Sequence, residues 1–391
     1  MSDNTFLDWP FFDERHRNFA TKLTTWAKNE IAPLENDDHN TNETLDRSFK
    51  SIIHKLGEAG WLKYTIPKAF GGALDELDVR HMALARSILG YHAGLADFAF
   101  AMQGLGSGSI TLFGSEELKQ KYLPDVGLGK RTAAFAISEP EGGSDVASMS
   151  TSAKLDGNHY VINGVKTWIS NAGIADQYVL FARTGDAPGA KGLSAFVIDA
   201  DNPGLKVTDR INVIAPHPLG TVTLTDCRVP TSSMLGQSGD GFKVAMTTLD
   251  IFRTTVGAAA LGFARRAMDE AIDRSKTREA FGKKIGDFQI IQAKIGDMAV
   301  KIDAAALLIY RSAWVKDVHK TRVTRESSMA KLYATESAQE VIDEAVQIFG
   351  GMGVVSGVIV ERLYREIRAL RIYEGTSEIQ KLVIAGQAMG A

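Results

Sequence analysis

The sequence holds one cysteine, Cys227, and it has neither a long apolar run nor a strong excess of one charge. A single cysteine excludes an internal disulfide and a cysteine-rich metal site, and it suits a reducing compartment. No segment reaches the roughly 18 consecutive apolar residues that a membrane-spanning helix needs. A net charge of −3, with acidic and basic residues intermixed, provides no basic stripe for nucleic acid. We therefore expect a cytoplasmic protein with no nucleic-acid partner and no integral membrane association.

Several common cofactor and metal motifs are also absent from the sequence. It contains no phosphate-binding Walker loop, and no GxGxxG segment opens a strand–helix–strand unit. It contains no HExxH, and its eight histidines show no spacing typical of metal ligands. We therefore expect neither a nucleotide-binding fold of the usual type nor a metal centre.

Proline is absent from residues 231–391, and this stretch has the pattern of long helices. Because proline breaks helix interiors, the stretch is free to be helical throughout. From Gln289, apolar residues recur every three or four positions, which is the pattern of one helix face. A second such run covers 329–348, and an alanine-rich run covers 242–275. Long amphipathic helices with short links predict an antiparallel bundle.

The middle of the chain is rich instead in short runs that favour strands. Between residues 159 and 230 these runs alternate with Gly, Pro, Asp and Asn, which is typical of a small antiparallel barrel or sandwich. Asn163-Gly164 lies between two such runs and predicts a hairpin turn. The first 130 residues again have helical spacing.

A chain of 391 residues exceeds a typical single core, so several domains are expected. The order of the patterns predicts an α+β multi-domain protein. We assign an N-terminal helical domain to residues 1–132, a middle β-domain to residues 133–240 and a helical bundle to residues 241–391.

Near the C-terminus, residues 370–381 read LRIYEGTSEIQK and place one carboxylate, Glu374, between an aromatic residue and a glycine. One interpretation is a solvated acid before a helix, with Ser377 and Gln380 as a capping box or Thr376 as the cap. The other is a base at the edge of an active site. The first suits a lone acidic residue in such a turn, but it leaves the order of the other motifs along the chain unexplained.

Two motifs in the middle of the chain also allow two interpretations. The segment 134–149, AFAISEPEGGSDVASM, can expose backbone N–H groups to a polar ligand, or Ser138 and Glu141 can form a capping box. Trp168, within KTWIS, can face a planar cofactor or pack in the core.

Two motifs in the last third are equally open. Asp250 and Arg253 lie three residues apart near an expected helix start, either as a surface ion pair or as a grip on a ligand with amides and phosphates. Arg278, Phe281 and Gln289 suit the phosphates and rings of a dinucleotide, and they equally suit an ordinary turn between two helices.

Taken together, these motifs resemble those of the acyl-CoA dehydrogenase family over essentially the full length of the chain. The resemblance includes the α–β–α order and several separated motifs in the order that the family has. The motifs are FGSEELKQKYLP (113–124), AISEPEGGSD (136–145), KTWIS (166–170), DCRVP (226–230), TREAFGKKIGDFQ (277–289), QIFGGMG (347–353) and RIYEGTSEIQ (371–380).

The resemblance implies the acyl-CoA dehydrogenase fold, whose C-terminal domain is a four-helix bundle. It also implies noncovalently bound FAD and a homotetramer, a dimer of dimers, in which a neighbouring subunit completes each FAD site. The residues that would bind FAD are Phe135, Ile137, Ser138, Trp168, Ile169, Ser170, Arg278, Phe281, Gln289, Gln347, Gly351, Thr376 and Glu378. Those that would border the acyl-CoA are Ser144, Asp250, Arg253 and Gly375.

The same resemblance implies that Glu374 is the catalytic base of an α,β-dehydrogenation. Glu374 would take the α-proton of a saturated acyl-CoA while the β-hydride passes to flavin N5, which yields a trans-2-enoyl-CoA. Electrons would then pass to an electron-transferring flavoprotein. Alternatives with the same fold are an enoyl-CoA reductase of an electron-bifurcating complex and an oxygen-using flavin oxidase. A DNA-associated relative would need a basic surface, which the net charge of −3 does not favour.

Two segments bear on the substrate. Residues 98–110 match the family's acyl-pocket helix and contain no Arg or Lys, which disfavours a dicarboxylic acyl group. Room for a branched or cyclic acyl group would come from their small residues, Gly104, Gly106, Ser107 and Gly108. The loop 211–220 departs from the family pattern, and we expect His217 within it to be a plain surface residue.

Overall fold

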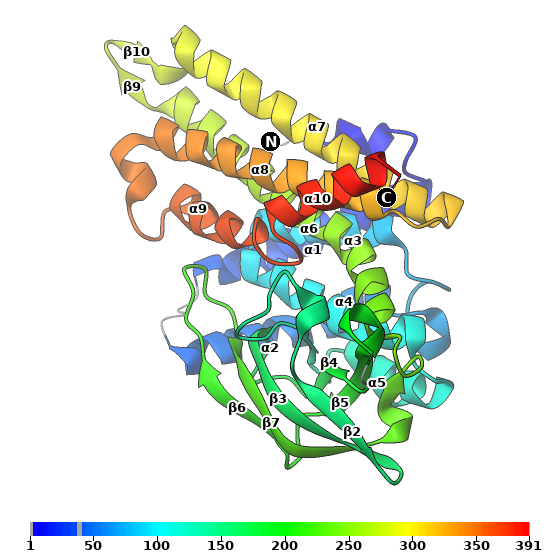
Figure 1. Cartoon of the computed structure of the whole chain (residues 1–391). Helices are drawn as coiled ribbons and strands as arrows, with labels where there is room; N and C mark the ends of the chain where they lie inside the picture. The colour runs from blue at the N-terminus through cyan, green and yellow to red at the C-terminus, as the bar shows by residue number, and fades with distance from the viewer. Residues whose placement is uncertain (1–2, 37–40, 186, 391) are drawn as a thin grey trace. The chain divides into compact units, whose positions relative to one another are not determined.

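The computed structural model describes residues 3–36, 41–185 and 187–390, which form two compact units (Figure 1). Unit 1 comprises the described residues of 1–36, 78–97 and 250–391, and unit 2 comprises those of 37–77 and 98–249.

Helices make up most of the described chain. Their bounds are α1 (Glu14–Glu30), α2 (Asn42–Glu58), α3 (Val79–His92), α4 (Gly94–Phe113), α5 (Glu116–Gly127), α6 (Gly241–Thr277), α7 (Gln289–His319), α8 (Thr324–Phe349), α9 (Ile359–Leu370) and α10 (Ser377–Ala388). The strands are β1 (Ala133–Ala136), β2 (Ser152–Asp156), β3 (His159–Ser170), β4 (Gln177–Arg183), β5 (Leu193–Asp199), β6 (Leu205–Arg210), β7 (Leu219–Pro230), β8 (Met234–Leu235), β9 (Glu279–Ala280) and β10 (Lys283–Lys284).

The long helices predicted from the absence of proline are confirmed. Helix α6 covers the alanine-rich run, and α7 begins at Gln289. Helix α8 ends at Phe349, where Gly350 follows with a φ of 62° that ends the helix. Of the helices in the described part of the chain, none combines the length and the apolar character that crossing a membrane requires.

Unit 1 is built from helices that approach closely because small residues lie where they meet. Helix α8 packs against α7, α9 and α10, and α3 packs against α1 and α7. At Gly257 of α6, an added Cβ would lie 3.2 Å from the backbone oxygen of Ala330 in α8. At Gly262, an added Cβ would lie 2.3 Å from the backbone oxygen of Ser87 in α3. These glycines therefore allow α6 to touch both neighbours.

Unit 2 carries an eight-stranded sheet among the described residues, in the order β6-β7-β3-β2-β4-β5-β8, with β1 paired to β4. The β1–β4 and β2–β4 pairings are parallel, and the others are antiparallel. The sheet is therefore mixed, whereas the sequence predicted an antiparallel one. The parallel pairs arise because other strands lie between their members along the chain: β2 and β3 lie between β1 and β4, and β3 lies between β2 and β4.

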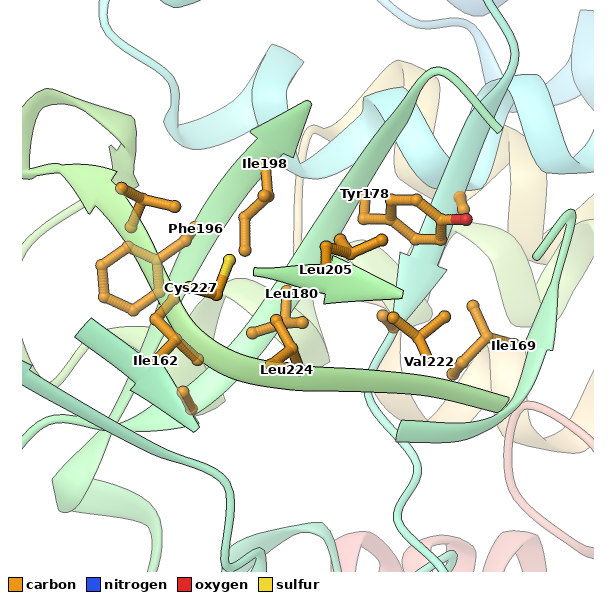
Figure 2. Close-up of a cluster of buried hydrophobic side chains, with 14 of the residues drawn as sticks. Ile162, Ile169, Tyr178, Leu180, Phe196, Ile198, Leu205, Val222, Leu224 and Cys227 are labelled. Carbon is orange, nitrogen blue, oxygen red and sulfur yellow. The ribbon is translucent and has the colours of Figure 1, made fainter. Parts of the chain in front are cut away.

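The core of unit 2 consists of buried side chains that converge from several strands of this sheet (Figure 2). Leu180, Phe196 and Val222 are fully buried there. The single cysteine, Cys227, belongs to the same cluster, and burial raises the pKa of its thiol to about 11. Cys227 is therefore an unreactive core residue.

The prediction of a hairpin turn at Asn163-Gly164 is wrong. Strand β3 continues through both residues, and its register with β7 shifts between Ile162 and Gly164. Gly164 has a φ of 154°, and an added Cβ would lie 2.5 Å from Thr151 Oγ1. Gly164 therefore allows a β-bulge in which β3 lies close to Thr151. The hairpin turn lies instead at residues 157–158, between β2 and β3.

We expect Leu180→Ala to lower the free energy of unfolding by about 2–5 kcal/mol, because it leaves a cavity in the fully buried core of unit 2. Leu155→Ala is the control, since Leu155 on β2 is 62% exposed, and it should change that free energy by no more than about 0.5 kcal/mol. Denaturant unfolding of both variants measures the difference. Equal losses in the two variants would contradict this location of the core.

Candidate functional site

Two consecutive residues between α9 and α10 have a left-handed backbone. The φ angle is 54° at Glu374 and 95° at Gly375. This conformation suits glycine, but it costs roughly 1–2 kcal/mol for a residue with a side chain. Helix α10 then begins at Ser377, and the Thr376 hydroxyl caps it by accepting a hydrogen bond from Ile379 N at 3.3 Å. Thr376 is therefore the cap, and the strained residue two positions before it, Glu374, points to a functional position.

Three side chains from different helices hold this turn. Arg253 Nε and Gln380 Nε2 donate hydrogen bonds to the Glu374 carbonyl, at 3.3 and 3.2 Å. Lys331 Nζ and Gln380 Nε2 donate to the Gly375 carbonyl, at 2.8 and 3.1 Å. A Cβ on Gly375 would lie 2.6 Å from Gln380 Nε2, so a larger residue would displace the end of the Gln380 side chain that donates to this turn.

Glu374 is half-buried, and one of its two carboxylate oxygens is buried. Its Oε2 atom has no hydrogen-bond partner within the part of the chain that the structure describes. Burial raises the pKa of Glu374, and the nearby cations Arg86, Lys331 and Arg253 oppose that rise. A buried carboxylate oxygen without a partner is costly, which points to a proton acceptor. The interpretation of Glu374 as a solvated turn residue is wrong.

Asp250 and Arg253 form an ion pair at 3.2 Å within α6, and each side chain is only 6% exposed. The interpretation of Asp250 and Arg253 as a surface ion pair is therefore wrong. Arg322 Nε and Thr324 Oγ1 also donate to Asp250, at 3.0 and 2.7 Å. Since Arg253 also donates to the Glu374 carbonyl, the pair is joined directly to the turn.

The stretch between α6 and α7 is a small hairpin, β9–β10, rather than an ordinary helix–helix turn. Phe281 and Gly282 form its tip, with φ angles of 53° and 79°. The Phe281 side chain is 96% exposed, and Phe288 meets it edge-on with ring centroids 6.2 Å apart. An aromatic ring this exposed is available to a ligand or to another subunit.

The remaining unit 1 residues predicted to contact the cofactor are exposed. They are Arg278, Gln289, Gln347, Gly351 and Glu378.

In unit 2, the two segments predicted to hold the cofactor lie side by side. Thr167 N donates to the Ser138 carbonyl at 3.0 Å, which joins the residues after β1 to β3. Trp168 follows at an irregularity of β3, with a φ of 59° and a side chain that is 59% exposed. The interpretation of Trp168 as a core residue is therefore wrong, and its indole is available to a ligand.

The other predicted residues of unit 2 differ in how far they are exposed. Phe135 and Ile169 are buried, Ile137 and Ser170 are half-buried, and Ser144 is exposed. Phe135 and Ile169 therefore present little surface to a ligand in this structure.

Sequence reasoning missed a buried ion pair between Glu139 and Lys166, whose charged atoms are 2.9 Å apart. Glu139 also accepts hydrogen bonds from Ser150 N and Thr151 N, at 2.6 and 2.9 Å, and Lys166 donates to the Ile137 carbonyl. Burial opposes the charge of Glu139, but Lys166 and these donors outweigh it and lower the pKa of Glu139 to about 2. Burial lowers the pKa of Lys166 to about 8.

This ion pair fixes the loop after β1 against β3. The signal in the sequence was a lysine inside an otherwise β-prone run, two residues before Trp168. The capping box proposed for Ser138 and Glu141 is wrong, because no helix begins there: Glu139 and Gly142 form an isolated bridge instead.

His217 is half-buried, so the expectation of a plain surface residue is wrong. Its ring lies 4.1 Å, centroid to centroid, from the ring of Phe98, and its Nδ1 is 3.1 Å from the Ala215 carbonyl. Burial lowers the pKa of His217 to about 4, so the ring is neutral at ordinary pH. In the structure this part of the 211–220 loop is a packing element.

The segment 98–110 lies in α4, and Gly106 does not leave open space there. A Cβ on Gly106 would lie 2.7 Å from the Cβ of Ala133 in β1. The Ser107 hydroxyl donates back to the Gln103 carbonyl at 2.6 Å. Gly106 therefore serves close packing of α4 on β1, and it cannot provide room for a substrate.

One cluster has the composition of a metal site. His16, Asp78 and His81 are buried, with possible ligand atoms within 4.8 Å of one another. However, His16 Nδ1 accepts a hydrogen bond from Asp13 N, and Asp78 is paired with Arg15 at 3.1 Å. A guanidinium on the carboxylate opposes a cation, so these contacts favour a structural cluster that joins α1 to α3.

Family models match three consecutive stretches of the chain. Their descriptions are acyl-CoA dehydrogenase, N-terminal domain (residues 13–130), middle domain (134–227) and C-terminal domain (239–389).

Individual proteins are similar over nearly the whole chain. The mitochondrial short-chain specific acyl-CoA dehydrogenase of Homo sapiens is 40% identical over 383 residues, which cover 96% of this chain and 90% of that protein. A subunit of the caffeyl-CoA reductase-Etf complex of Acetobacterium woodii is 36% identical over 390 residues, which cover 97% of this chain and 99% of that subunit.

Solved structures show the same fold. Butyryl-CoA dehydrogenase from Megasphaera elsdenii superposes with a TM-score of 0.89 at 32% identity, covering 97% of this chain and 99% of that one. A glutaryl-CoA dehydrogenase from Mycobacterium smegmatis in complex with FADH2 superposes with a TM-score of 0.86 at 25% identity, covering 97% and 96%. The chain therefore belongs to the acyl-CoA dehydrogenase family of FAD-dependent oxidoreductases.

Proposed function

We propose that the protein converts a saturated acyl-CoA thioester to the trans-2-enoyl-CoA, with Glu374 as the base that removes the α-proton. The observation that carries this proposal is the buried Oε2 of Glu374, which has no partner among the described residues and lies in a strained turn. The similarity to acyl-CoA dehydrogenases over nearly the full length supports the reaction class.

The chemistry explains why these features suit a base. A C–H bond next to a thioester carbonyl is a weak acid, so its removal needs a base and stabilisation of the developing enolate. Burial raises the pKa of Glu374 and so makes it a stronger proton acceptor than a solvated carboxylate. The backbone N–H of Glu374 would donate to the thioester carbonyl oxygen, as in an oxyanion hole. When bound, FAD supplies the acceptor for the β-hydrogen and its electron pair.

The residues present fit an FAD site and an acyl-CoA site. Exposed Trp168 and the neighbouring backbone of residues 135–138 and 169–170, with Ser138 and Ser170, would hold the flavin from unit 2. Exposed Arg278, Phe281, Gln289, Gln347 and Gly351 would meet the FAD of a neighbouring subunit, and Thr376 and Glu378 would complete that site. Ser144, Asp250, Arg253 and Gly375 would border the acyl-CoA.

The proposed assembly is a homotetramer, a dimer of dimers, in which neighbouring subunits share each FAD. Large apolar side chains on α7 and α10 support it, because Ile290, Val300 and Leu382 are each about two-thirds exposed. Sharing FAD between subunits would make an isolated monomer inactive.

The electron acceptor would be an electron-transferring flavoprotein. The Acetobacterium relative, a subunit of a reductase-Etf complex, supports such a partner, and it also supports a second function. In that function the same site would reduce an enoyl-CoA. In either case the acyl group would be uncharged, because residues 98–110 contain no Arg or Lys to pair with a second carboxylate. Branched and cyclic acyl groups are included in the test below.

We expect one class of saturated acyl-CoA to bleach the oxidised flavin in an anaerobic titration. The panel contains short linear, long linear, branched, aryl-substituted and cyclic acyl-CoAs. Glu374→Gln should slow the bleaching at least about 100-fold, because it removes the general base. Glu43→Gln, at an exposed residue of α2, is the matched control and should bleach at the wild-type rate.

Two results would contradict the proposal. One is bleaching in Glu374→Gln at the wild-type rate. The other is no bleaching by any member of the panel in a protein that holds FAD. In that case the corresponding enoyl-CoAs are added to the reduced protein, and reoxidation of the flavin would establish the reductase function.

The pH dependence of kcat/KM should report the raised pKa of Glu374. The base must be ionised, so activity is present above this pKa and is lost as the pH falls through it. Because burial raises the pKa, the acid limb should lie above the pKa of about 4.3 of an ordinary glutamate. A pH–rate profile measures it, and a limb at or below the ordinary value would show that Glu374 is not desolvated.

A further inference from the structure

Lys331 of α8 is a lysine whose side chain is wholly buried. Its ammonium donates to the Gly375 carbonyl at 2.8 Å, so it reaches from α8 to the turn between α9 and α10. We propose that Lys331 is a positioning residue for the Glu374 base: it holds the Glu374–Gly375 turn and so fixes the direction of the carboxylate. This role rests on the proposed function of Glu374.

Burying an ammonium group is expensive, and this cost argues against a purely structural role. An apolar side chain of similar length would fill the space between the helices without that cost. Burial lowers the pKa of Lys331 to about 8, and the charge of Glu374 opposes this effect. Lys331 and Glu374 therefore stabilise each other's charged forms.

The turn needs such a partner because its backbone is strained. Arg253 and Gln380 both donate to the Glu374 carbonyl. Arg253 is shared with Asp250, and Gln380 carries no charge. Of these three donors, Lys331 is therefore the one that brings a positive charge to the Gly375 carbonyl. Gly375 is the residue at which the chain turns toward α10.

The pH dependence of the base involves charges from several helices. Those that face Glu374 include Arg86 on α3, Asp97 on α4, Arg253 on α6 and Lys331 on α8, and the neighbouring Tyr373 also interacts with it. Those that face Lys331 are Glu374, Arg253, Glu336 and Glu378. Since Lys331 lowers the pKa of Glu374, removing its charge should raise that pKa and move the acid limb of kcat/KM to higher pH.

The test compares Lys331→Met and Lys331→Arg with the wild-type holoenzyme. In Lys331→Met, kcat should fall about 10- to 100-fold, because a small misplacement of a reacting group costs this much. KM should change less than about threefold, and the acid limb should move to higher pH. Lys331→Arg keeps the charge and the donor, so its acid limb should stay at the wild-type position.

Arg80→Met is the matched control for loss of a buried cation, because Arg80 is 5% exposed and paired with Asp317 at 3.1 Å. It should lower Tm without moving the acid limb. If Lys331→Met does not fold, Lys331→Gln replaces it in the test. The glutamine keeps a hydrogen-bond donor but has no charge, so the acid limb of kcat/KM should still move to higher pH. A Lys331 variant that lowers only Tm, as Arg80→Met does, would overturn the positioning role.

Glu374→Gln separates this role from the function on which it rests. An active Glu374→Gln enzyme would overturn the proposed base and the role of Lys331 together. An inactive Glu374→Gln enzyme beside a Lys331→Met enzyme with wild-type kcat and acid limb would overturn the role of Lys331 alone.

Discussion

The candidate site depends on one constraint, the left-handed turn at Glu374 and Gly375. A residue with a side chain adopts this conformation only where its surroundings outweigh the strain. Here the surroundings are donors from α6, α8 and α10, namely Arg253, Lys331 and Gln380. The close packing of these helices therefore serves the geometry of the turn as well as the stability of the unit.

The β-unit uses a similar solution for the segments that would hold the flavin. A buried lysine, Lys166, again joins two stretches of backbone, this time through Glu139 and the Ile137 carbonyl. Lys166 and Lys331 both have pKa values lowered to about 8 by burial. In each case a charge removed from water is offset by partners that a loop supplies, so the loop and the lysine depend on each other.

Some of the predictions followed the usual behaviour of a residue type, but the residue in this structure has a different environment. Asn163-Gly164 has the composition of a hairpin turn, but pairing with β7 on both sides keeps β3 extended through it. Histidines are often exposed, but Phe98 covers His217. Trp168 has the composition of a core residue, yet an irregularity in β3 turns it outward. Pairing and packing outweighed local preference each time.

The sequence by itself determined the order of helical and β segments, the extent of the long helices and the family, because these follow from proline placement, apolar spacing and the order of motifs. Only the tertiary structure decided which polar groups are buried and what they meet. Arg253 and the Glu374 carbonyl are 121 residues apart in the chain, and Lys331 and the Gly375 carbonyl are 44 apart. Burial and pairing arise from such distant contacts, which local periodicity does not encode.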